Sequence, residues 1–393
     1  MKILIATDTY YPHVNGASYF TQRLARGLML RGHEVRVLAP SRGYVNERYV
    51  KDGVTVEGIR SFPVMAHTGY RSAFPVGISK SVGRVFDQFT PDVVHLQGHF
   101  FINRAARRHA DTRGIPIVGT NHFMPENLVH YLPVPASVRR AVVRAAWHDF
   151  CSVFSSLDAV TTPTKTAADL MHRVGFRGDV TAISCGVDLG RFQGVEKRTS
   201  VRSRYSISDD TTLFLYVGRL DREKNIDLLL RAFAASDARN SHFLVVGKGH
   251  EGVRLAYLTR ELGISSRVTF AGFVPDADLP SVYCAADCFL IAGTAELQSI
   301  VTMEAMVAGL PVIGVRAVAL PELIHHDSNG FLFEHGDERA VASFMDLLAR
   351  DAQLRAQMGA RSLEIIAQHE ISRSLAAYEE IYVRVSSRAG LYS

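Results

Sequence analysis

The chain has no run of apolar residues long enough to cross a membrane, because no stretch approaches the roughly 18 residues that a spanning helix needs. It is also poor in cysteine, and its four cysteines show no Cys-x-x-Cys spacing (Cys151, Cys185, Cys284 and Cys288). They are therefore interpreted as buried small side chains in a reducing cytosol rather than as a metal or redox centre. The start, MKILIATDTYY, has one lysine and a short apolar run, which predicts a first strand and not a signal peptide.

Patterns for cofactors, metals and nucleic acids are missing as well. The first half has no Gly-x-Gly-x-x-Gly fingerprint for a dinucleotide. The clusters DAD (276–278) and HHD (325–327) have no third converging ligand and lie in turn-like sequence, so no metal site is predicted. The basic residues are not interleaved with aromatic ones on a recognisable motif, which disfavours nucleic acid as a partner.

The bulk composition fits a globular protein of two domains. The chain has 393 residues, of which 47% are hydrophobic and 21% charged, enough for two separate cores. Its net charge of +5 is uneven: residues 1–190 hold 22 Lys and Arg against 14 Asp and Glu (+8), and residues 191–393 hold 22 against 25 (−3). This asymmetry indicates either two surfaces with different partners or scattered solvated charge.

Strand-like and helix-like segments alternate along the chain. In the first half, strands are predicted at 2–8, 34–40, 54–60, 92–98, 115–122, 159–164 and 180–186, and helices at 17–32, 78–90, 100–113, 136–156 and 165–174. The second half has strands at 213–219, 242–249, 267–274, 288–293, 311–315 and 329–334 and ends in helices at 337–349, 351–368 and 371–387. The order predicts an α/β protein with two doubly wound, Rossmann-like domains, whose ligands lie beyond the carboxyl ends of the strands.

A polar, arginine-rich segment at 188–212 interrupts this alternation and is typical of an interdomain linker. We therefore expect an N-terminal domain at 1–190, a linker at 191–212, a second domain at 213–370 and a terminal helical segment at 371–393. Two such domains facing each other would form a cleft.

The turn after the strand at 213–219 carries two cations. Gly218 and Arg219 end that strand, and Lys224 follows near a helix start, where N–H groups also attract anions. The pair indicates a site for phosphate oxygens, with a salt-bridged surface loop as the alternative.

Weaker candidates follow the next two strands. Gly247 and Gly249 would let a ligand approach the backbone closely, or they are simply the glycines of a turn. Phe273 and Val274 could form part of a pocket for a base, with a structural turn as the alternative.

The stretch AELQSIVTME places Glu296 and Glu304 on either side of a predicted helix start. Ser299 suits the N-cap, so the N–H groups of Ile300 and Val301 would be open to an anion. A carboxylate accepts hydrogen bonds from vicinal hydroxyls, so the two glutamates suit a sugar and a ribose. The alternative is a helix-start glutamate followed by a solvated one.

In the first domain, Asn15 and Gly16 stand at a helix entrance, where backbone can meet a phosphate, and Asn15 is also a candidate for acceptor binding, with Asn121 and His122. His122 ends another strand and, as a neutral imidazole, could bond a sugar hydroxyl or guide an acceptor. A structural histidine is the alternative. Asn121 and Glu126 are weaker candidates beside it.

Taken together, the stretches GRLDREKN, VGKGHE, AGFV and ELQSIVTMEAMVAGLPVIG resemble the retaining, nucleotide-sugar-dependent glycosyltransferases of family 4, which have the GT-B fold. NGAS near the N-terminus and GVDLGRF before the linker fit the same family, so the resemblance covers nearly the whole chain. It implies donor binding on the second domain and acceptor binding on the first, with the terminal helix crossing back onto the first domain. It implies no cofactor and no metal.

Carried over to this sequence, the resemblance assigns Arg219 and Lys224 to the diphosphate, Glu304 to the ribose and Glu296 to the donor sugar. The sequence departs from many family members after the first glutamate, where it has Leu297, Gln298 and Ser299 in place of Gly-Phe-Gly-like residues. The identity of the sugar is therefore open, and Gln298 could itself bond it.

The resemblance also implies that Gly16 contacts the phosphates and that His122 lies beside the sugar and the acceptor. The cations and the helix N-terminus would stabilise the leaving diphosphate, whose own oxygen would act as the base. A double displacement would need a carboxylate nucleophile on the opposite face of the sugar, and the sequence offers no candidate.

The acceptor is less defined. Segments 100–113 and 133–150 are cationic and partly amphipathic, which suits an anionic membrane surface and a lipid such as diacylglycerol or phosphatidylinositol. An ordinary helix packed on the sheet is the alternative, as is a soluble natural-product or polysaccharide acceptor. The expected location is the cytoplasm or the inner face of the cell membrane.

Three other activities remain compatible with two such domains. They are a nucleotide-sugar 2-epimerase, a phosphorylase-like enzyme with pyridoxal phosphate, and a sugar-nucleotide-binding protein without catalysis. The sequence leaves open whether the nucleotide is uridine or guanosine, which hexose is used and how the chain oligomerises.

Overall fold

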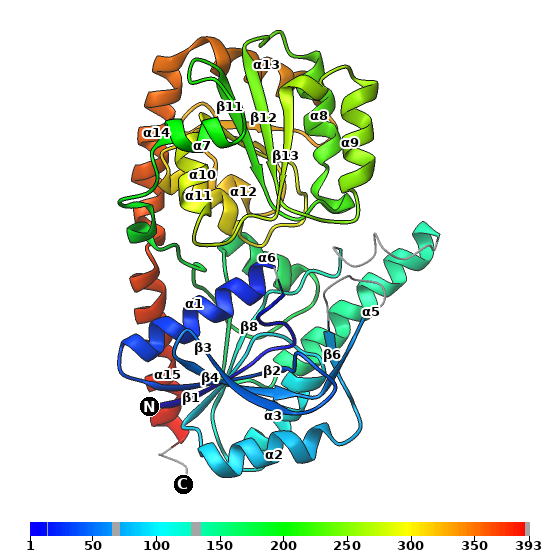
Figure 1. The fold of residues 1–393 in the computed structure, drawn as a ribbon. Helices are drawn as coiled ribbons and strands as arrows, with labels where there is room; N and C mark the ends of the chain where they lie inside the picture. Colours follow the sequence, from blue (N-terminus) through cyan, green and yellow to red (C-terminus); the bar gives the residue numbers. More distant parts are fainter. Residues whose placement is uncertain (14, 65–70, 127–134, 390–393) are drawn as a thin grey trace. The chain divides into compact units, whose positions relative to one another are not determined.

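The computed structural model describes residues 1–13, 15–64, 71–126 and 135–389, and the chain divides into two compact units (Figure 1). Unit 1 comprises Met1–Cys185 together with Ser372–Ser393, and unit 2 comprises Gly186–Ile371. The last helix therefore returns to unit 1, as the resemblance implied. Both units are α/β, which confirms the predicted fold class.

Unit 1 is built on an eight-stranded sheet with the order β10-β9-β8-β7-β1-β2-β4-β3. The strands are β1 (Lys2–Ala6), β2 (Glu34–Pro40), β3 (Glu47–Lys51), β4 (Val54–Ile59), β7 (Val93–Leu96), β8 (Ile117–Thr120), β9 (Ala159–Thr162) and β10 (Val180–Ala182). They pair in parallel except β3, which is antiparallel to β4. The sequence analysis missed β3 because ERYVK is polar, as befits a half-exposed edge strand. It also missed a small hairpin of β5 (Ser61–Pro63) and β6 (Arg71–Ala73).

The helices of unit 1 are α1 (Gly16–Leu30), α2 (Ile78–Phe89), α3 (Phe101–Asp111), α5 (Ala136–Phe154), α6 (Lys165–Arg173) and α15 (Ile371–Ala389). Helices α2 and α3 bury their apolar sides against the sheet in one core cluster. Within the described residues, no helix is both long and apolar enough to cross a membrane.

Helix α15 is fixed to unit 1 by buried polar contacts. His95, fully buried on β7, lies 2.7 Å from Tyr382 Oη through Nδ1 and 2.7 Å from Thr120 Oγ1 through Nε2. Burial lowers the pKa of His95 to about 3, so the ring is neutral. At the surface, Glu379 accepts hydrogen bonds from Arg31 Nε at 2.9 Å, which adds a second attachment.

Unit 2 has a six-stranded parallel sheet with the order β13-β12-β11-β14-β15-β16. Its strands are β11 (Thr212–Val217), β12 (Ser241–Val246), β13 (Val268–Gly272), β14 (Cys288–Ile291), β15 (Val312–Val315) and β16 (Gly330–Phe333). Its helices are α7 (Arg198–Arg204), α8 (Ile226–Ala235), α9 (Gly252–Glu261), α10 (Leu279–Ala285), α11 (Ile300–Val307), α12 (Leu320–Leu323), α13 (Glu338–Arg350) and α14 (Ala352–Ile366), with short 3-10 turns η1 (Leu189–Phe192), η2 (Arg222–Lys224), η3 (Ser265–Arg267) and η4 (Ala367–His369).

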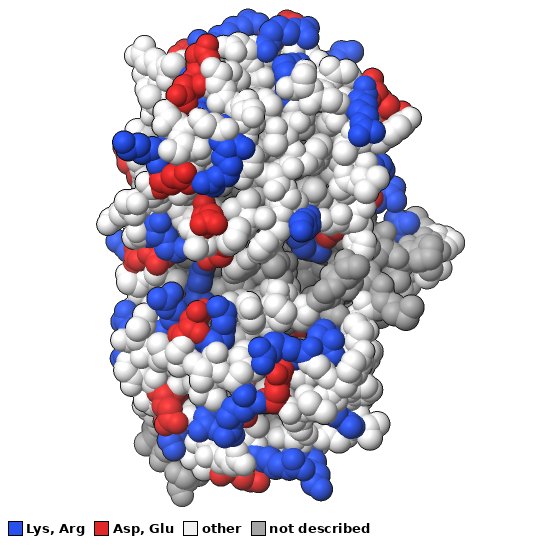
Figure 2. All heavy atoms as spheres, viewed as in Figure 1, with Lys and Arg blue, Asp and Glu red and all other residues white. Residues whose placement is uncertain are grey.

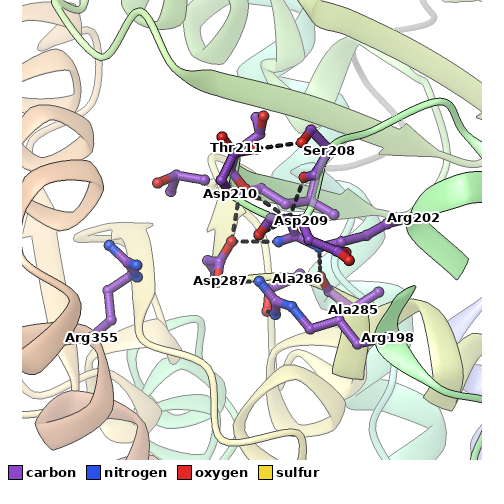
Figure 3. Close-up of polar contacts among 12 residues, drawn as sticks. Arg198, Arg202, Ser208, Asp209, Asp210, Thr211, Ala285, Ala286, Asp287 and Arg355 are labelled. Carbon is purple, nitrogen blue, oxygen red and sulfur yellow. Dashed lines mark hydrogen bonds and ion pairs between the residues drawn. The ribbon is translucent and has the colours of Figure 1, made fainter. Parts of the chain in front are cut away.

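The segment 191–212, expected as a linker, is instead an integral part of unit 2. Its helix α7 carries Arg202, a fully buried arginine whose Nη2 donates to Asp287 Oδ2 at 2.7 Å (Figure 3). The same guanidinium donates to four backbone carbonyls, those of Ser208, Asp209, Thr211 and Ala285. Arg198 binds the other oxygen of Asp287 at 2.6 Å. The prediction of a linker was wrong because the residue type alone does not show whether an arginine is buried or exposed to solvent.

Each sheet has one point at which its strand order reverses. In unit 1, β1 lies between β2 and β7, and in unit 2, β11 lies between β12 and β14. Loops that leave such a pair of strands run to opposite faces of the sheet and open a crevice at the carboxyl ends, where α/β proteins bind ligands. On this rule, the crevice expected for unit 2 lies between the loops after Val217 and Ile291, and that for unit 1 lies between the loops after Ala6 and Leu96.

Candidate active site

The loop after β11 carries Arg219, whose guanidinium group is hydrogen-bonded to two carboxylates. Arg219 Nη1 donates to Asp221 Oδ2 at 2.5 Å, and Nη2 donates to Glu223 Oε1 at 2.8 Å. The side chains of Asp221 and Glu223 are only 4% and 2% exposed. The sequence analysis named Arg219 as a phosphate ligand and missed both acids, although they stand in the same GRLDREKN stretch.

Lys224 faces Glu296 across the unit 2 crevice. Lys224 Nζ donates to Glu296 Oε1 at 2.6 Å, and both side chains are less than one-fifth exposed. Gly293 lies beside the pair, since a Cβ there would sit 3.0 Å from Glu296 Oε1 and 3.4 Å from Lys224 Cδ. Asn225 Nδ2 donates to Ala292 O at 3.0 Å and ties the two loops together. Two predicted site residues that are 72 positions apart thus meet directly.

Helix α11 begins where the sequence predicted. Ser299 is its N-cap, and Ser299 Oγ accepts from Thr302 N at 3.3 Å. Ile300 and Val301 lie in the first turn of the helix, where the backbone N–H groups have no carbonyl acceptor within the helix. Gln298 is 9% exposed, so most of its side chain is buried beside the helix start. The helix N-terminus follows Glu296 closely in the chain and adds a partial positive charge to the same crevice.

Glu304 lies on the second turn of α11 and is 3% exposed. Arg191 Nη1 donates to Glu304 Oε1 at 3.1 Å, and Arg191 Nη2 donates to Asp276 O at 2.6 Å. Arg191 therefore connects Glu304 to the loop after β13, which carries Phe273 and Val274. The ring of Phe273 is half-exposed, at 49%. The sequence analysis missed Arg191, although the GVDLGRF stretch contains it.

The glycines after β12 have a packing function. Gly247 has a φ of 135°, and a Cβ on it would overlap the carbonyl oxygen of Gly218. A Cβ on Gly249 would overlap the backbone of Leu220. These glycines therefore allow the loops after β11 and β12 to touch. Their contact with a ligand stays a prediction.

At the start of α1, Asn15 and Gly16 have different roles. Asn15 is the N-cap: its Oδ1 accepts from Ser18 N at 2.9 Å and its Nδ2 donates to Thr9 Oγ1 at 2.7 Å. The side chain of Asn15 therefore caps the helix, and this structural role is an alternative to the predicted role in acceptor binding. A Cβ on Gly16 would meet no atom within 4 Å, and its φ is not positive, so the fold does not require glycine there.

His122 lies beyond β8 in unit 1. Its Nε2 is 2.9 Å from Gln97 Oε1, and its ring centroid is 4.6 Å from that of Phe20. Burial lowers the pKa of His122 to about 3, so the imidazole is neutral at physiological pH. Asn121 is 1% exposed and its Oδ1 accepts from the N–H of Phe123, which shapes the loop that follows.

Neither metal candidate of the sequence forms a cluster. Within the ranges that the structure describes, no three His, Cys, Asp or Glu side chains are grouped to hold a metal ion. His326, from the HHD stretch, accepts a hydrogen bond at Nδ1 from Leu332 N at 3.0 Å. All four cysteines are free thiols, and Cys185 and Cys288 are buried.

The two halves of the chain match two family models. The model described as Glycosyltransferase Family 4 matches residues 14–191, and the model described as Glycosyl transferases group 1 matches residues 197–364. This chain belongs to the family 4 glycosyltransferases.

Relatives and solved structures agree with this assignment. The glycosyltransferase is 28% identical over 375 residues to an alpha-monoglucosyldiacylglycerol synthase of Streptococcus pneumoniae, covering 94% of this chain and 83% of the relative. It is 25% identical to an N-acetyl-alpha-D-glucosaminyl L-malate synthase of Bacillus anthracis over 98% of both chains. A sucrose-phosphate synthase of Thermosynechococcus elongatus has the same GT-B fold, with a TM-score of 0.83, 18% identity and coverage of 99% and 100%.

Proposed function

We propose that this glycosyltransferase moves a hexose from a UDP- or GDP-hexose to a hydroxyl group of a membrane lipid such as diacylglycerol or phosphatidylinositol. The transfer would proceed with retention and without a metal ion. The observation that carries the proposal is the Lys224–Glu296 pair, 2.6 Å apart in the crevice of unit 2. A diphosphate beside Lys224 and the start of α11, with a hexose at Glu296, would use both groups.

The charges in this crevice suggest a division of labour. An ammonium group has three N–H donors, and Lys224 directs one of them to Glu296, so others remain for phosphate oxygens. Arg219 brings less uncompensated charge, because Asp221 and Glu223 each accept one of its hydrogen bonds. We therefore assign most of the stabilisation of the leaving diphosphate to Lys224 and the N–H groups of α11, with Arg219 as a further donor.

The remaining site residues have roles that follow from their contacts. Glu304 would accept the ribose hydroxyls, with Arg191 fixing the orientation of its carboxylate at 3.1 Å. Gly16 would let the phosphates approach the backbone of α1. Neutral His122 would accept a hydrogen bond from a substrate hydroxyl. The acceptor would attack from the face that the diphosphate leaves, and a phosphate oxygen would take its proton.

A lipid acceptor is supported by the surface of unit 1. Figure 1 shows α5 extending away from the sheet at its N-terminal end. Four large apolar side chains on α5 and at the start of α3 are 38% to 44% exposed: Val138, Val142, Phe100 and Phe101. Arg140 and Arg144 accompany them on α5. Exposed apolar groups among arginines suit a membrane with anionic lipids at the inner face of the cell membrane.

The charge on the face shown in Figure 2 does not select a partner. Described basic and acidic side chains are interspersed there, and no single basic surface covers this face. On this face, scattered solvated charge is favoured over a broad anionic partner. The membrane proposal therefore rests on α5 and the start of α3, and on the relative named for diacylglycerol.

A small soluble acceptor is the second candidate. It is favoured by the relative named as an N-acetyl-alpha-D-glucosaminyl L-malate synthase, which matches over 98% of this chain. The two candidates differ in whether transfer requires a lipid surface.

The donor site can be tested by thermal shift with UDP, GDP, ADP and their common hexose derivatives, in EDTA, on wild type and on Glu304→Gln. One nucleotide should stabilise the wild type, and the variant should lose that shift, because the amide replaces a carboxylate that accepts from ribose. Glu334→Gln, an exposed glutamate, is the matched control and should keep the shift. If no nucleotide stabilises the wild type in EDTA, the metal-independent donor site is wrong.

The acceptor can be tested with the nucleotide sugar that gives the shift. Transfer to diacylglycerol or phosphatidylinositol in vesicles should exceed transfer to L-malate or soluble sugars. It should fall when Val138 and Val142 are both replaced by serine. Transfer only to a soluble acceptor, unaffected by that double change, would favour the second candidate.

A further inference from the structure

Gln97 lies at the carboxyl end of the unit 1 sheet. It directly follows β7, at the point where the strand order reverses beside β1. Its backbone N–H lies 2.8 Å from Ala6 O and 3.1 Å from Asn103 Oδ1, so its position is fixed from two sides. The residue is 5% exposed.

The amide of Gln97 is only half satisfied by the protein. Its Oε1 lies 2.9 Å from His122 Nε2. Its Nε2 is buried and has no hydrogen-bonding partner among the residues that the structure describes. Buried amide groups are normally hydrogen-bonded, so the fold leaves the amide nitrogen unsatisfied while the amide oxygen is held at His122, which points to a role of Gln97 in placing that ring.

The contact also decides which nitrogen of His122 carries the proton. An amide oxygen only accepts hydrogen bonds, so the ring hydrogen must be on Nε2 and Nδ1 must carry a lone pair. The neighbouring imidazole of His95 is itself buried, and burial lowers the pKa of both rings to about 3. Neither ring therefore gains a proton near neutral pH, and the tautomer is the only variable.

We propose that Gln97 is a positioning residue that holds His122 as its Nε2–H tautomer, so that His122 Nδ1 is left to accept a hydrogen bond from one substrate hydroxyl. Gln97 would act through the imidazole and would not itself touch that hydroxyl, because the two ring nitrogens point to opposite sides of the ring. The ligand is a neutral hydroxyl rather than a carboxylate or phosphate, because an anionic oxygen would face the lone pair on Nδ1. This inference rests on the proposed role of His122, and the hydroxyl belongs either to the hexose or to the acceptor.

The tautomer can be measured without any substrate. Nitrogen NMR of protein labelled at histidine, with the His122 signals assigned by comparison with His122→Gln, distinguishes a protonated Nε2 from a protonated Nδ1. The wild type should have the proton on Nε2, and Gln97→Met, which removes the acceptor, should populate both tautomers. Gln88→Met, an exposed glutamine at the end of α2, should leave the spectrum unchanged. A wild-type proton on Nδ1, or a tautomer that ignores Gln97→Met, would overturn the inference.

Kinetics test the substrate half of the inference. Gln97→Met should lower kcat/KM about tenfold, the effect of one hydrogen bond that His122 no longer makes to the substrate, while its melting temperature stays near that of the wild type. If the hydroxyl belongs to the hexose, the variant should also lose the extra thermal stabilisation of UDP-glucose over UDP, or of GDP-mannose over GDP. If it belongs to the acceptor, that difference should persist and the acceptor KM should rise.

Two further results are informative. Wild-type kinetics in both Gln97→Met and His122→Gln, with transfer intact, would overturn hydroxyl binding by His122 and its positioning by Gln97, and would leave the glycosyltransferase function standing. Failure of the proposed function itself would look different, because the wild type would then show neither transfer nor a nucleotide-dependent shift.

Discussion

Replacing Arg202 by methionine tests whether the segment after the unit boundary belongs to the core of unit 2. Methionine is apolar and of similar length, so it can stay buried at the fully buried position of Arg202. It removes the donor to Asp287 and to four carbonyl oxygens (Ser208, Asp209, Thr211 and Ala285). Asp287 keeps its contacts with Arg198 and with the N–H of Leu213.

The expected loss follows from these contacts. Removing one partner of a buried ion pair costs about 3–5 kcal/mol, because the other charge remains buried. The four carbonyls that lose a donor add to this cost, whereas Arg198 and Leu213 N reduce it. We expect a loss of about 4 kcal/mol, which for a unit of this size lowers the melting temperature by roughly 10 °C.

The assay is calorimetry on the full chain, with the unit 2 transition identified by its response to the stabilising nucleotide. Arg198→Met is the matched control, because Arg198 binds the same carboxylate of Asp287 but its side chain is 39% exposed. Exposed ion pairs contribute about 1 kcal/mol or less, so this variant should shift the transition by only a few degrees. If Arg202→Met costs no more than Arg198→Met, the segment is not held as the structure indicates and the argument from burial is wrong.

Two further predictions concern unit 1. Gly16→Ala should leave stability unchanged or slightly higher, since the new Cβ meets no atom, yet lower transfer at least tenfold if the diphosphate contacts this backbone; transfer within twofold of the wild type would contradict this. Burial lowers the pKa values of His95 and His122 to about 3 and that of His99 to about 4, whereas the histidine pKa in the unfolded chain is 6.5, so only the unfolded chain gains these protons between pH 7 and pH 5. The free energy of unfolding, measured with urea, should therefore fall by about 5–6 kcal/mol between pH 7 and pH 5, and by about two-thirds as much in His95→Gln. Equal values at both pH values would refute the neutral, buried imidazoles.

The alternation of strands and helices was readable from the sequence because both faces of each sheet are covered, which makes the strands continuous apolar runs. Their ends were less readable. The strand predicted at 115–122 is Ile117–Thr120, because its bounds are set by pairing with β7 and β9, and the sequence alone does not show that pairing. The edge strand β3 was missed for the opposite reason: its polar side chains face water.

The candidate site was only partly predictable. Lys224, Glu296 and the N-cap Ser299 were found because a strand end followed by a helix start is a local pattern. Arg191 and Gln97 were missed because their partners lie 113 and 25 positions away, and no local spacing reveals such contacts.

The sequence by itself determined the two α/β sheets and the family, because these depend on periodicity and short motifs, and the resemblance to that family implied the return of the last helix. The tertiary structure alone decided which charges are compensated and which polar atoms are open. It assigned Arg219 to two buried acids, Arg202 to the core and Gln97 to His122. The physical reason is that charge compensation and hydrogen bonding depend on distances of a few ångströms between residues that are remote in the chain, and only the packed fold sets those distances.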